Sequence, residues 1–468
     1  MPSSTFDSLW SDLEPVGRTR SGGYRRFAWT AEDHTLREWF AGECRRRGLD
    51  LTTDRVGNQW GWWWDGPGTV DDAVTAGRPG VAIGSHLDSV PDGGAFDGPL
   101  GVVSALAAVD RLREAGLTPD VPLAVVNFVD EEGARFGIAC AGSRVLAGQL
   151  SPERALALTD ADGTTYAEAL RAAGRDPADL GPDEETLRRV GTFVELHVEQ
   201  GRALVDLGAP VAVASDIWPH GRWRFDFPGE ANHAGTTRLE DRRDAMLGYA
   251  DLVLGARHVA AQRGCVATVG KVAVTPGGVN AIPSRVTGWL DARGPQEDQV
   301  EALVDELTGR AAELGAEVVR ESWTPTTRFD TDLSDRLRGV LRGAAGTAVP
   351  RGAGDGGMVR GAGGIDAPLS VPVLGTGAGH DAGILATAGV PSAMLFVRNP
   401  TGVSHSPAEH AERDDCHAGV EALAACVREL TVRATDPRAA RPAGQDAPAA
   451  RPAGQDAPDT PPLPDADA

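Results

Sequence analysis

Short apolar runs alternate with helical patterns through most of this chain, and this alternation limits the possible fold more than any other feature. The runs at 81–85, 123–130 and 192–199 have the length of buried strands, whereas residues 101–116 repeat apolar side chains at helical spacing. A strand followed by a helix and another strand builds a mostly parallel sheet covered by helices. We therefore predict an α/β fold whose main domain has a mostly parallel sheet flanked by helices.

Residues 215–328 have a different pattern, which predicts a smaller α+β domain inserted into the main one. RWRFDFPG (222–229) alternates like a half-exposed strand, and long helical patterns follow at 241–264 and 297–315. Two further strands are predicted between these helices, at 265–274 and 284–293. This β-α-β-β-α arrangement would leave strand edges free to pair with a partner chain.

These patterns predict the domain boundaries. The main domain is expected to consist of residues 1–214 and 329–435, with the inserted domain at 215–328. Residues 436–468 are rich in Pro, Ala, Asp and Gly and contain RPAGQDAP twice, so they cannot bury enough apolar surface to fold, and we expect a disordered tail. The Gly-rich stretch 351–364 is expected to be a flexible loop, since it lacks the lysine of a phosphate-binding loop.

Composition excludes several classes of protein. With 45 basic and 67 acidic side chains among 468 residues, the formal charge is −22, which argues against nucleic acid as a partner. The amino-terminal segment lacks the pattern of a signal peptide, and no apolar stretch approaches the 18 residues of a membrane span. Five scattered cysteines without a CxxC pair favour neither disulfides nor a thiolate zinc site. We expect a cytoplasmic protein.

The segment GSHLDSVPDGGAFDGPLG (84–101) carries the first candidate site. It places His86 and Asp88 two residues apart at the end of a predicted strand, and Asp97 follows in a glycine-rich loop. A divalent metal prefers imidazole and carboxylate ligands, and a ligating histidine usually has a carboxylate behind it. His86 and Asp97 are therefore candidate ligands, with Asp88 as the orienting group. The alternative is a surface turn with solvated acids.

Three further segments favour the metal interpretation. FVDEEGARFG (128–137) ends a predicted strand with Glu131 and Glu132, so one glutamate can bind metal while the other moves a proton. His197 lies in the apolar run FVELHVEQG, where a buried core histidine is the alternative. His405 lies in a small-residue loop near the chain end, where a surface histidine is the alternative.

Together these segments resemble the metal-dependent aminoacylase and exopeptidase superfamily. Within it, the chain is most similar to the branch of N-carbamoyl amino acid hydrolases, ureidoglycolate hydrolases and allantoate amidohydrolases. The resemblance covers roughly residues 15–430. It is carried by seven ordered motifs: GSHLDSVPDGGAFDGPLG, EEGARFG, ELHVEQG, NHAGTT (232–237), NAIPSRV (280–286), GAGHDA (377–382) and SHSPAE (404–409).

The resemblance implies two divalent metal ions per chain, bridged by one carboxylate. His86 and His197 match the ligands of one metal, Glu132 and His405 match the ligands of the other, and Asp97 matches the shared carboxylate. Histidine and carboxylate ligands do not separate Zn²⁺ from Mn²⁺. Such a pair lowers the pKa of water and polarises the attacked carbonyl.

The resemblance also implies roles for the remaining acids. Glu131 matches the general base that deprotonates the attacking water, and Asp88 matches the residue behind His86. The implied protein is an enzyme, a metal-dependent hydrolase of C–N bonds other than peptide bonds. A metal-free scaffold relative is the alternative, but none of the implied ligands is missing.

Four residues match the substrate side of the family. Asn280 and Arg293 match positions that hold a substrate carboxylate, for which an arginine fork is suited. Gln200 matches a polar contact with substrate. His233 matches a histidine that stabilises the tetrahedral oxyanion, in some members from the partner subunit, so a homodimer is expected. The alternatives are a surface ion pair for Arg293 and turn chemistry for His233 and Asn280.

The chain departs from the family pattern at Arg238, where proline often follows NHAGTT, and at Arg398 and Asn399, where relatives often read FVPS. His380 and Asp381 receive no firm role. Additional arginine near the pocket suits an anionic, ureido-rich substrate, so the sequence favours allantoate, whose hydrolysis releases ammonia and CO2. N-carbamoyl-L-amino acid hydrolysis is the alternative, and dipeptidase or aminoacylase activity is third.

Overall fold

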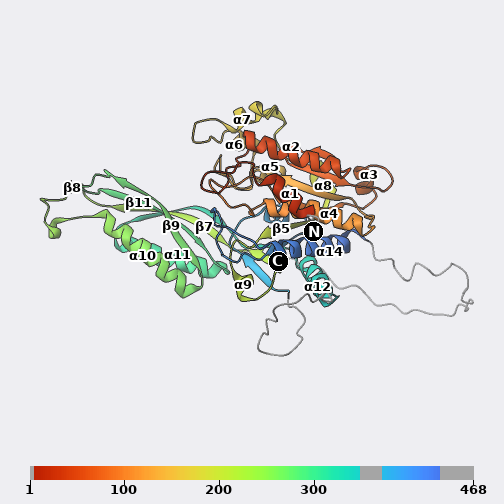
Figure 1. Ribbon diagram of the computed structural model, residues 1–468. Helices are drawn as coiled ribbons and strands as arrows, with labels where there is room; N and C mark the ends of the chain where they lie inside the picture. The colour runs from red at the N-terminus through yellow and green to blue at the C-terminus, as the bar shows by residue number, and fades with distance from the viewer. Residues whose placement is uncertain (1–4, 348–370, 433–468) are drawn as a thin grey trace, which may run out of the picture. The chain divides into compact units, whose positions relative to one another are not determined.

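The computed structural model describes residues 5–347 and 371–432, which form one large sheet, one smaller sheet and a short two-stranded ribbon (Figure 1). The glycine-rich loop predicted at 351–364 and the tail predicted at 436–468 lie outside the described residues. No helix in the described part of the chain combines the length and apolarity needed to cross a bilayer. All five cysteines are free thiols.

The large sheet has nine strands in the order β1-β2-β4-β3-β5-β15-β6-β13, with β14 paired to β6. Its strands are β1 (Asp50–Thr53), β2 (Gln59–Trp63), β3 (Gly80–His86), β4 (Leu123–Phe128), β5 (Val190–Val198), β6 (Val211–Ile217), β13 (Thr327–Arg328), β14 (Val373–Thr376) and β15 (Ser392–Val397). The central four, β4, β3, β5 and β15, are parallel. The pairings β1–β2, β2–β4, β15–β6 and β6–β13 are antiparallel, whereas β14 pairs with β6 in parallel. The predicted α/β class and its parallel centre are therefore confirmed.

Helices cover both faces of this sheet. They are α1 (Thr5–Leu13), α2 (Ala31–Arg46), α3 (Val70–Thr75), α4 (Pro99–Glu114), α5 (Ala141–Leu146), α6 (Pro152–Leu156), α7 (Tyr166–Ala172), the 3₁₀ turn η1 (Pro177–Asp179), α8 (Glu184–Arg189), α9 (Ala203–Asp206), α12 (Thr331–Thr347), α13 (Asp381–Thr387) and α14 (Arg413–Thr431). Along β3, Val81 and Ile83 enter one apolar core with α4 and α14, whereas Ala82 enters the other with α5 and α13. Strands buried on both faces explain the continuous apolar runs of the sequence.

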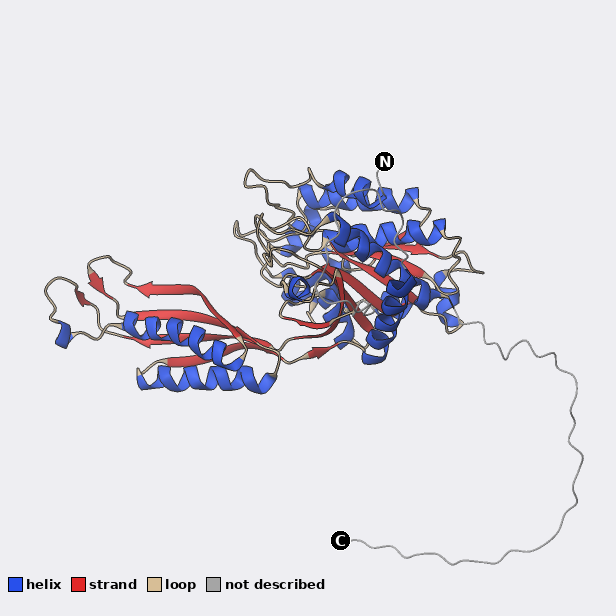
Figure 2. Cartoon of the chain, turned by 60° about the horizontal axis from the view of Figure 1, so that its bottom comes forward, coloured by secondary structure: helices blue, strands red, loops and turns tan. Residues whose placement is uncertain are grey.

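Residues of the predicted insertion form the smaller sheet (Figure 2). Its strand order is β12-β7-β11-β9. The elements of this part are β6's successor β7 (His220–Pro228), β8 (Asn232–His233), η2 (Leu239–Asp241), α10 (Ala245–Arg263), β9 (Val266–Thr275), β10 (Ala281–Ile282), β11 (Arg285–Arg293), α11 (Glu297–Glu313) and β12 (Glu317–Thr324). All its pairings are antiparallel, and β8 and β10 form the separate ribbon. The sequence did not predict β12, whose half-exposed edge position gives it no clear apolar alternation.

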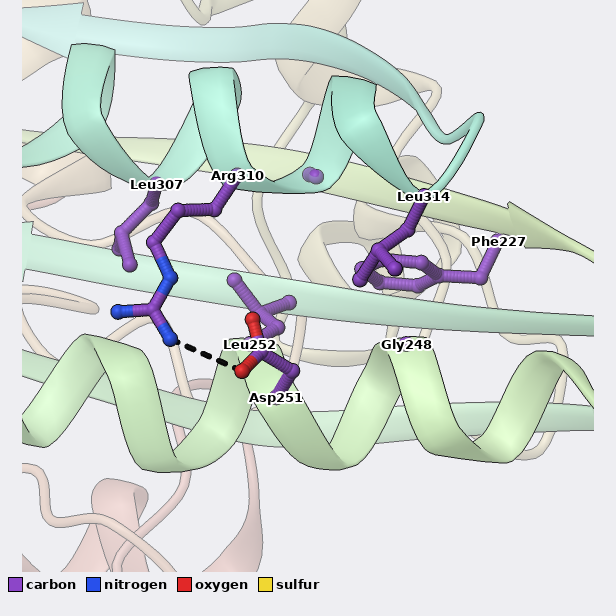
Figure 3. Close-up of a pocket in the computed structure, with 8 residues that line it drawn as sticks. Phe227, Gly248, Asp251, Leu252, Leu307, Arg310 and Leu314 are labelled. Atoms are coloured by element: carbon purple, nitrogen blue, oxygen red, sulfur yellow. Dashed lines mark hydrogen bonds and ion pairs between the residues drawn. The ribbon is translucent and has the colours of Figure 1, made fainter.

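Helices α10 and α11 pack together against this sheet and enclose a small hollow lined by apolar side chains of both (Figure 3). Arg310 of α11 reaches Asp251 of α10, with 2.9 Å between Nη2 and Oδ1. Gly248 lies where a side chain would meet the Phe227 ring, so the helix can approach the sheet closely. This hollow is part of the apolar packing. The domain boundaries themselves stay a prediction.

Candidate functional site

The candidate site begins at the carboxyl end of the central parallel strands, where the loops of an α/β sheet usually carry ligands. β3 ends at His86, and the neighbouring strand β5 carries His197 one residue before its end. Both imidazoles are buried, and their ring centroids lie 6.0 Å apart. Adjacent parallel strands therefore bring together two histidines that lie more than 100 residues apart in the sequence.

Asp97 lies between two groups of potential ligands. Its Oδ1 is 3.1 Å from Nε2 of His197 and 3.9 Å from Nε2 of His86. Its Oδ2 is 3.2 Å from Nε2 of His405, which in turn is 3.5 Å from Oε2 of Glu132. Each carboxylate oxygen of Asp97 thus faces a different group of side chains.

The ligand atoms in each group are close enough to hold one ion. His86, Asp97 and His197 form one group, and Asp97, Glu132 and His405 form the other, with the ligand atoms of each within 4.8 Å of one another. Among the described residues, the buried Nε2 atom of His86 and Oε1 of Glu132 have no hydrogen-bond partner, and Nε2 of His197 has only the Asp97 carboxylate beside it. Because buried polar atoms are normally satisfied, these atoms fit metal coordination.

The charges within the site are strongly coupled. Burial opposes a charge on His86, but the carboxylates of Glu131 and Asp88 outweigh it and raise the pKa of His86 well above its usual value. A hydrogen bond to Asp97 raises the pKa of His405 to about 9. Burial raises the pKa of Glu132 to about 7. Without cations, protons bound to these side chains therefore neutralise part of the carboxylate charge that metal ions would otherwise neutralise.

Asp88 lies behind His86 and also contacts the loop that carries both glutamates. Its Oδ1 lies 3.4 Å from Nδ1 of His86. The same carboxylate accepts the backbone N–H groups of Glu131 (3.2 Å) and Glu132 (3.0 Å). One buried carboxylate therefore connects the end of β3 with the loop that follows β4.

Glu131 is buried beside the ligands. Its Oε2 lies 3.6 Å from Nε2 of His86, whereas its Oε1 accepts a hydrogen bond from the Cys140 thiol at 3.2 Å. Burial raises the pKa of the Glu131 carboxyl well above its usual value. One oxygen of Glu131 thus faces the candidate metal ligands, in a position suited to exchange a proton there.

The loop that presents His405 begins with a turn built by Asn399. Oδ1 of Asn399 accepts the N–H groups of Thr401 and Gly402, and its Nδ2 donates to Val403. His405 itself has φ of +54°. The sequence difference at Asn399 therefore organises this ligand loop.

The arginines that suggested an anionic, ureido-rich substrate have other partners. Arg398 binds Asp415 through two hydrogen bonds of 2.8 Å. Arg238 is exposed and pairs with Glu240 and Asp241. Neither side chain provides an unpaired positive charge, so the structure removes this argument for allantoate.

Gln200 and Arg293 both have partners within the chain. Nε2 of Gln200 donates to Oδ2 of Asp97 at 2.8 Å, which places Gln200 beside the ligands. Arg293 donates to both oxygens of Asp291, at 2.7 and 3.1 Å, and its Nη1 donates to the carbonyl of Gly377 at 2.6 Å. Gly377 begins the segment that leads to His380. A substrate carboxylate at Arg293 would therefore compete with these acceptors.

His233 and Asn280 lie at the other end of the smaller sheet. β8, which contains His233, pairs with β10, and Ala234 donates to the carbonyl of Asn280. β10 leads directly into β11, whose first residue is Arg285 and whose last is Arg293. At about 3.3 Å per residue, the two ends of β11 are about 26 Å apart. One chain therefore does not bring His233 and Asn280 together with Arg293.

Two residues near the site had no role predicted from the sequence. The buried His380 imidazole packs on His197, with ring centroids 4.5 Å apart, and forms a third potential ligand group with His197 and Glu195. The motif GAGHDA was the available signal. Cys140 is brought to Glu131 by a turn in which its backbone N–H donates to the Glu131 carbonyl. No sequence pattern indicated this contact.

Comparison with known proteins gives consistent results. Residues 82–429 match the peptidase family M20/M25/M40. An N-carbamoyl-L-amino acid amidohydrolase of Geobacillus stearothermophilus is 37% identical over 91% of this chain and 98% of its own length. A ureidoglycolate hydrolase of Arabidopsis thaliana is 30% identical over 90% and 85%. The crystal structure of a hydantoinase/carbamoylase family amidase from Burkholderia ambifaria is 33% identical, with a TM-score of 0.72 over 92% and 98%.

Proposed function

Because the chain belongs to the peptidase family M20/M25/M40, in its carbamoylase branch, we propose that it hydrolyses N-carbamoyl-L-amino acids with two divalent metal ions. As a hydrolase of non-peptide C–N bonds, it needs an activated water and a polarised carbonyl. The observation that carries the proposal is Asp97, whose two oxygens face two separate ligand groups. The names of four relatives favour carbamoyl amino acids over allantoate as substrate.

The residues present would hold the cations as follows. His86 and His197 would bind one, Glu132 and His405 the other, and Asp97 both. When bound, Zn²⁺ or Mn²⁺ would lower the pKa of a water molecule and polarise the carbamoyl carbonyl. Both metals accept this ligand set, so their identity is left to the assay.

Glu131 would transfer the proton. Its Oε2 faces the ligands, so it can accept a proton from the attacking water and deliver that proton to the departing nitrogen. Attack of water on the carbamoyl carbon forms the new C–O bond, after which the C–N bond to the amino acid nitrogen breaks and the amino acid leaves with the proton from Glu131. The other product is carbamate, which decomposes to ammonia and CO2 by loss of its own C–N bond. Asp88 holds the backbone of Glu131 during this transfer.

Arg293 and Gln200 would orient the substrate. We assign the substrate carboxylate to Arg293, which requires the Gly377 carbonyl to give up Nη1. Gln200 would contact the substrate through Oε1, a buried atom without a partner among the described residues.

His233 and Asn280 would act from a partner subunit, because about 26 Å of β11 separates them from Arg293 in the same chain. The edge strand β9 and the outer face of α10 support a homodimer. Leu247 and Leu254, seven residues apart on α10, are 71% and 72% exposed. Apolar side chains beside an exposed strand edge are typical of an interface between chains.

Product analysis tests the reaction. The metal-reconstituted protein is incubated with N-carbamoyl-L-amino acids, ureidoglycolate and allantoate, and free amino acid and ammonia are measured. We expect equal release of amino acid and ammonia from the carbamoyl amino acids. Activity confined to allantoate or ureidoglycolate would reject the proposed substrate, and a protein that binds no metal would reject the mechanism.

Sedimentation tests the subunit arrangement. We expect a dimer for the wild type and a monomer with little activity for Leu254→Glu. The matched control is Leu207→Glu, at an exposed leucine after α9 outside the smaller sheet. A wild type that sediments only as a monomer would contradict the proposed role of His233.

A further inference from the structure

The buried carboxylate of Glu409 connects the two loops that supply Asp97 and His405. Oε1 of Glu409 accepts the backbone N–H groups of Phe96 (2.8 Å) and Asp97 (2.9 Å). Its Oε2 accepts the hydroxyl of Ser404 at 2.9 Å. Glu409 is 5% exposed, and more than 300 residues separate it from the first loop. A buried charge with three donors is a specific arrangement, since such a group is costly to bury otherwise.

The space around Glu409 is shaped to fit this side chain. A Cβ at Gly94 would lie 2.3 Å from Oε1 of Glu409, so only glycine lets the carboxylate lie against this loop. Ser404 also lies within 3.2 Å of Oδ2 of Asp97. That oxygen is the one facing His405. Glu409 therefore holds the backbone of Asp97 directly and shares with its carboxylate the Ser404 hydroxyl, whose single proton can serve either acid.

We propose that Glu409 is a positioning residue for the metal centre. Its hydrogen bonds hold Asp97 in the orientation in which each Asp97 oxygen faces one ligand group. The inference rests on the proposed metal-dependent function. Glu409 belongs to neither ligand group of Asp97 among the described residues, so it acts through Asp97 rather than on the ions. Groups that orient ligands in this way commonly change metal affinity by about 10- to 100-fold when they are removed.

The hydrogen bonds of Glu409, rather than its negative charge, should hold Asp97 in place. In Glu409→Gln, the amide oxygen can still accept both N–H groups, and the amide nitrogen can donate to the Ser404 hydroxyl. In Glu409→Ala, the two N–H groups of the Asp97 loop lose their acceptor. The two variants therefore separate positioning from the loss of one negative charge.

The test is a Co²⁺ titration of the metal-stripped full chain, followed by visible absorption and by competition with a chelator. We expect two Co²⁺ ions in the wild type and at least tenfold weaker binding in Glu409→Ala, with an altered absorption band. Glu409→Gln should bind within about threefold of the wild type, since its hydrogen bonds remain. The matched control Glu421→Ala removes an exposed glutamate of α14 and should behave like the wild type.

Two outcomes would overturn the role of Glu409 alone: Glu409→Ala binding Co²⁺ within threefold of the wild type, or Glu409→Gln binding as weakly as Glu409→Ala. A wild type that binds no Co²⁺ would instead reject the metal centre, and the role of Glu409 with it. If Glu409→Ala does not fold, Gly94→Ala provides the same test, because its methyl group must displace the carboxylate. Unchanged affinity in Gly94→Ala would overturn the inference.

Discussion

Gly98→Ala should damage the metal centre without changing any ligand. Gly98 has φ of +85° and ψ of −60°. A Cβ there would lie 2.4 Å from Cε1 and Nδ1 of the His86 ring. Ordinary contacts begin near 3.4 Å, so the ring must move by about 1 Å. Metal–ligand distances tolerate only about 0.2 Å, and a shift of this size should detach His86.

Gly98→Ala has two effects, a strained backbone at the new alanine and a clash with the His86 ring, and a control variant separates them. A side chain at a positive φ of this kind costs about 1–3 kcal/mol of folding stability. Gly116→Ala carries the same type of cost, since Gly116 has φ of +71° with no atom within 4 Å of the new methyl group. Gly98→Ala should therefore lose more stability than Gly116→Ala, and it alone should bind metal at least tenfold more weakly.

The assays are denaturant unfolding of the metal-free proteins and Zn²⁺ competition with a chromophoric chelator. The reasoning would be refuted if Gly98→Ala bound Zn²⁺ like the wild type while being no less stable than Gly116→Ala. Weak Zn²⁺ binding by Gly116→Ala would also refute it, because a backbone cost alone would then explain the loss.

Glu131→Gln should lower kcat by about 10²- to 10⁴-fold and leave the metal content unchanged, as measured by ammonia release and elemental analysis; a normal kcat would exclude Glu131 as the base. Arg293→Ala should raise KM by roughly 10- to 100-fold with little change in kcat, which corresponds to the loss of about 1.5–3 kcal/mol for a charged hydrogen bond. Arg293→Lys should recover only part of the lost affinity for substrate. An unchanged KM would place the substrate carboxylate elsewhere. The pKa of His405 is about 9 in the metal-free fold, so this residue is protonated at pH 7.5 and Zn²⁺ binding should release protons. Calorimetry in buffers of different ionisation enthalpy measures that release, and identical heats in all buffers would contradict it.

The raised pKa of His405 also predicts how the folding stability of the metal-free chain changes with pH. The folded-state pKa of His405 lies above the usual 6.5 because of its hydrogen bond to Asp97. The stabilisation by this pair is therefore complete below about pH 6.5 and is lost as the pH rises through about 9. His405 is half exposed, so solvent screening reduces the effect.

The sequence predicted much of the fold because buried parallel strands leave long apolar runs. The same apolar runs place His86 at the end of β3 and Glu132 just after the end of β4, where the sequence analysis expected strands to end. The roles of these residues came from the resemblance to a family, because spacing alone did not distinguish a ligand from a solvated acid.

What the sequence did not predict depends on contacts between distant segments. Arg398 looked available for an anion, but the first turn of α14 presents Asp415 to it. Cys140 reaches Glu131 only because the intervening turn folds back. The separation of His233 from Arg293 follows from the length of β11, which matters only once the strands are paired. Substrate choice depends on such contacts. The pairing of Arg398 with Asp415 therefore weakens the prediction of allantoate, which relied on an available arginine.

The placement of β15 at the centre of the large sheet has a consequence for how the enzyme is made. β5, which carries His197, is flanked by β3 and by β15, and β15 comes nearly 200 residues after β5 in the chain. His405 lies in the loop between β15 and α14. During synthesis, the ribosome therefore completes neither the surroundings of His197 nor the second ligand group until most of the chain has emerged. Metal loading of the second candidate ligand group therefore belongs to the end of translation, because a product that stops before β15 would carry Asp97 and Glu132 without His405.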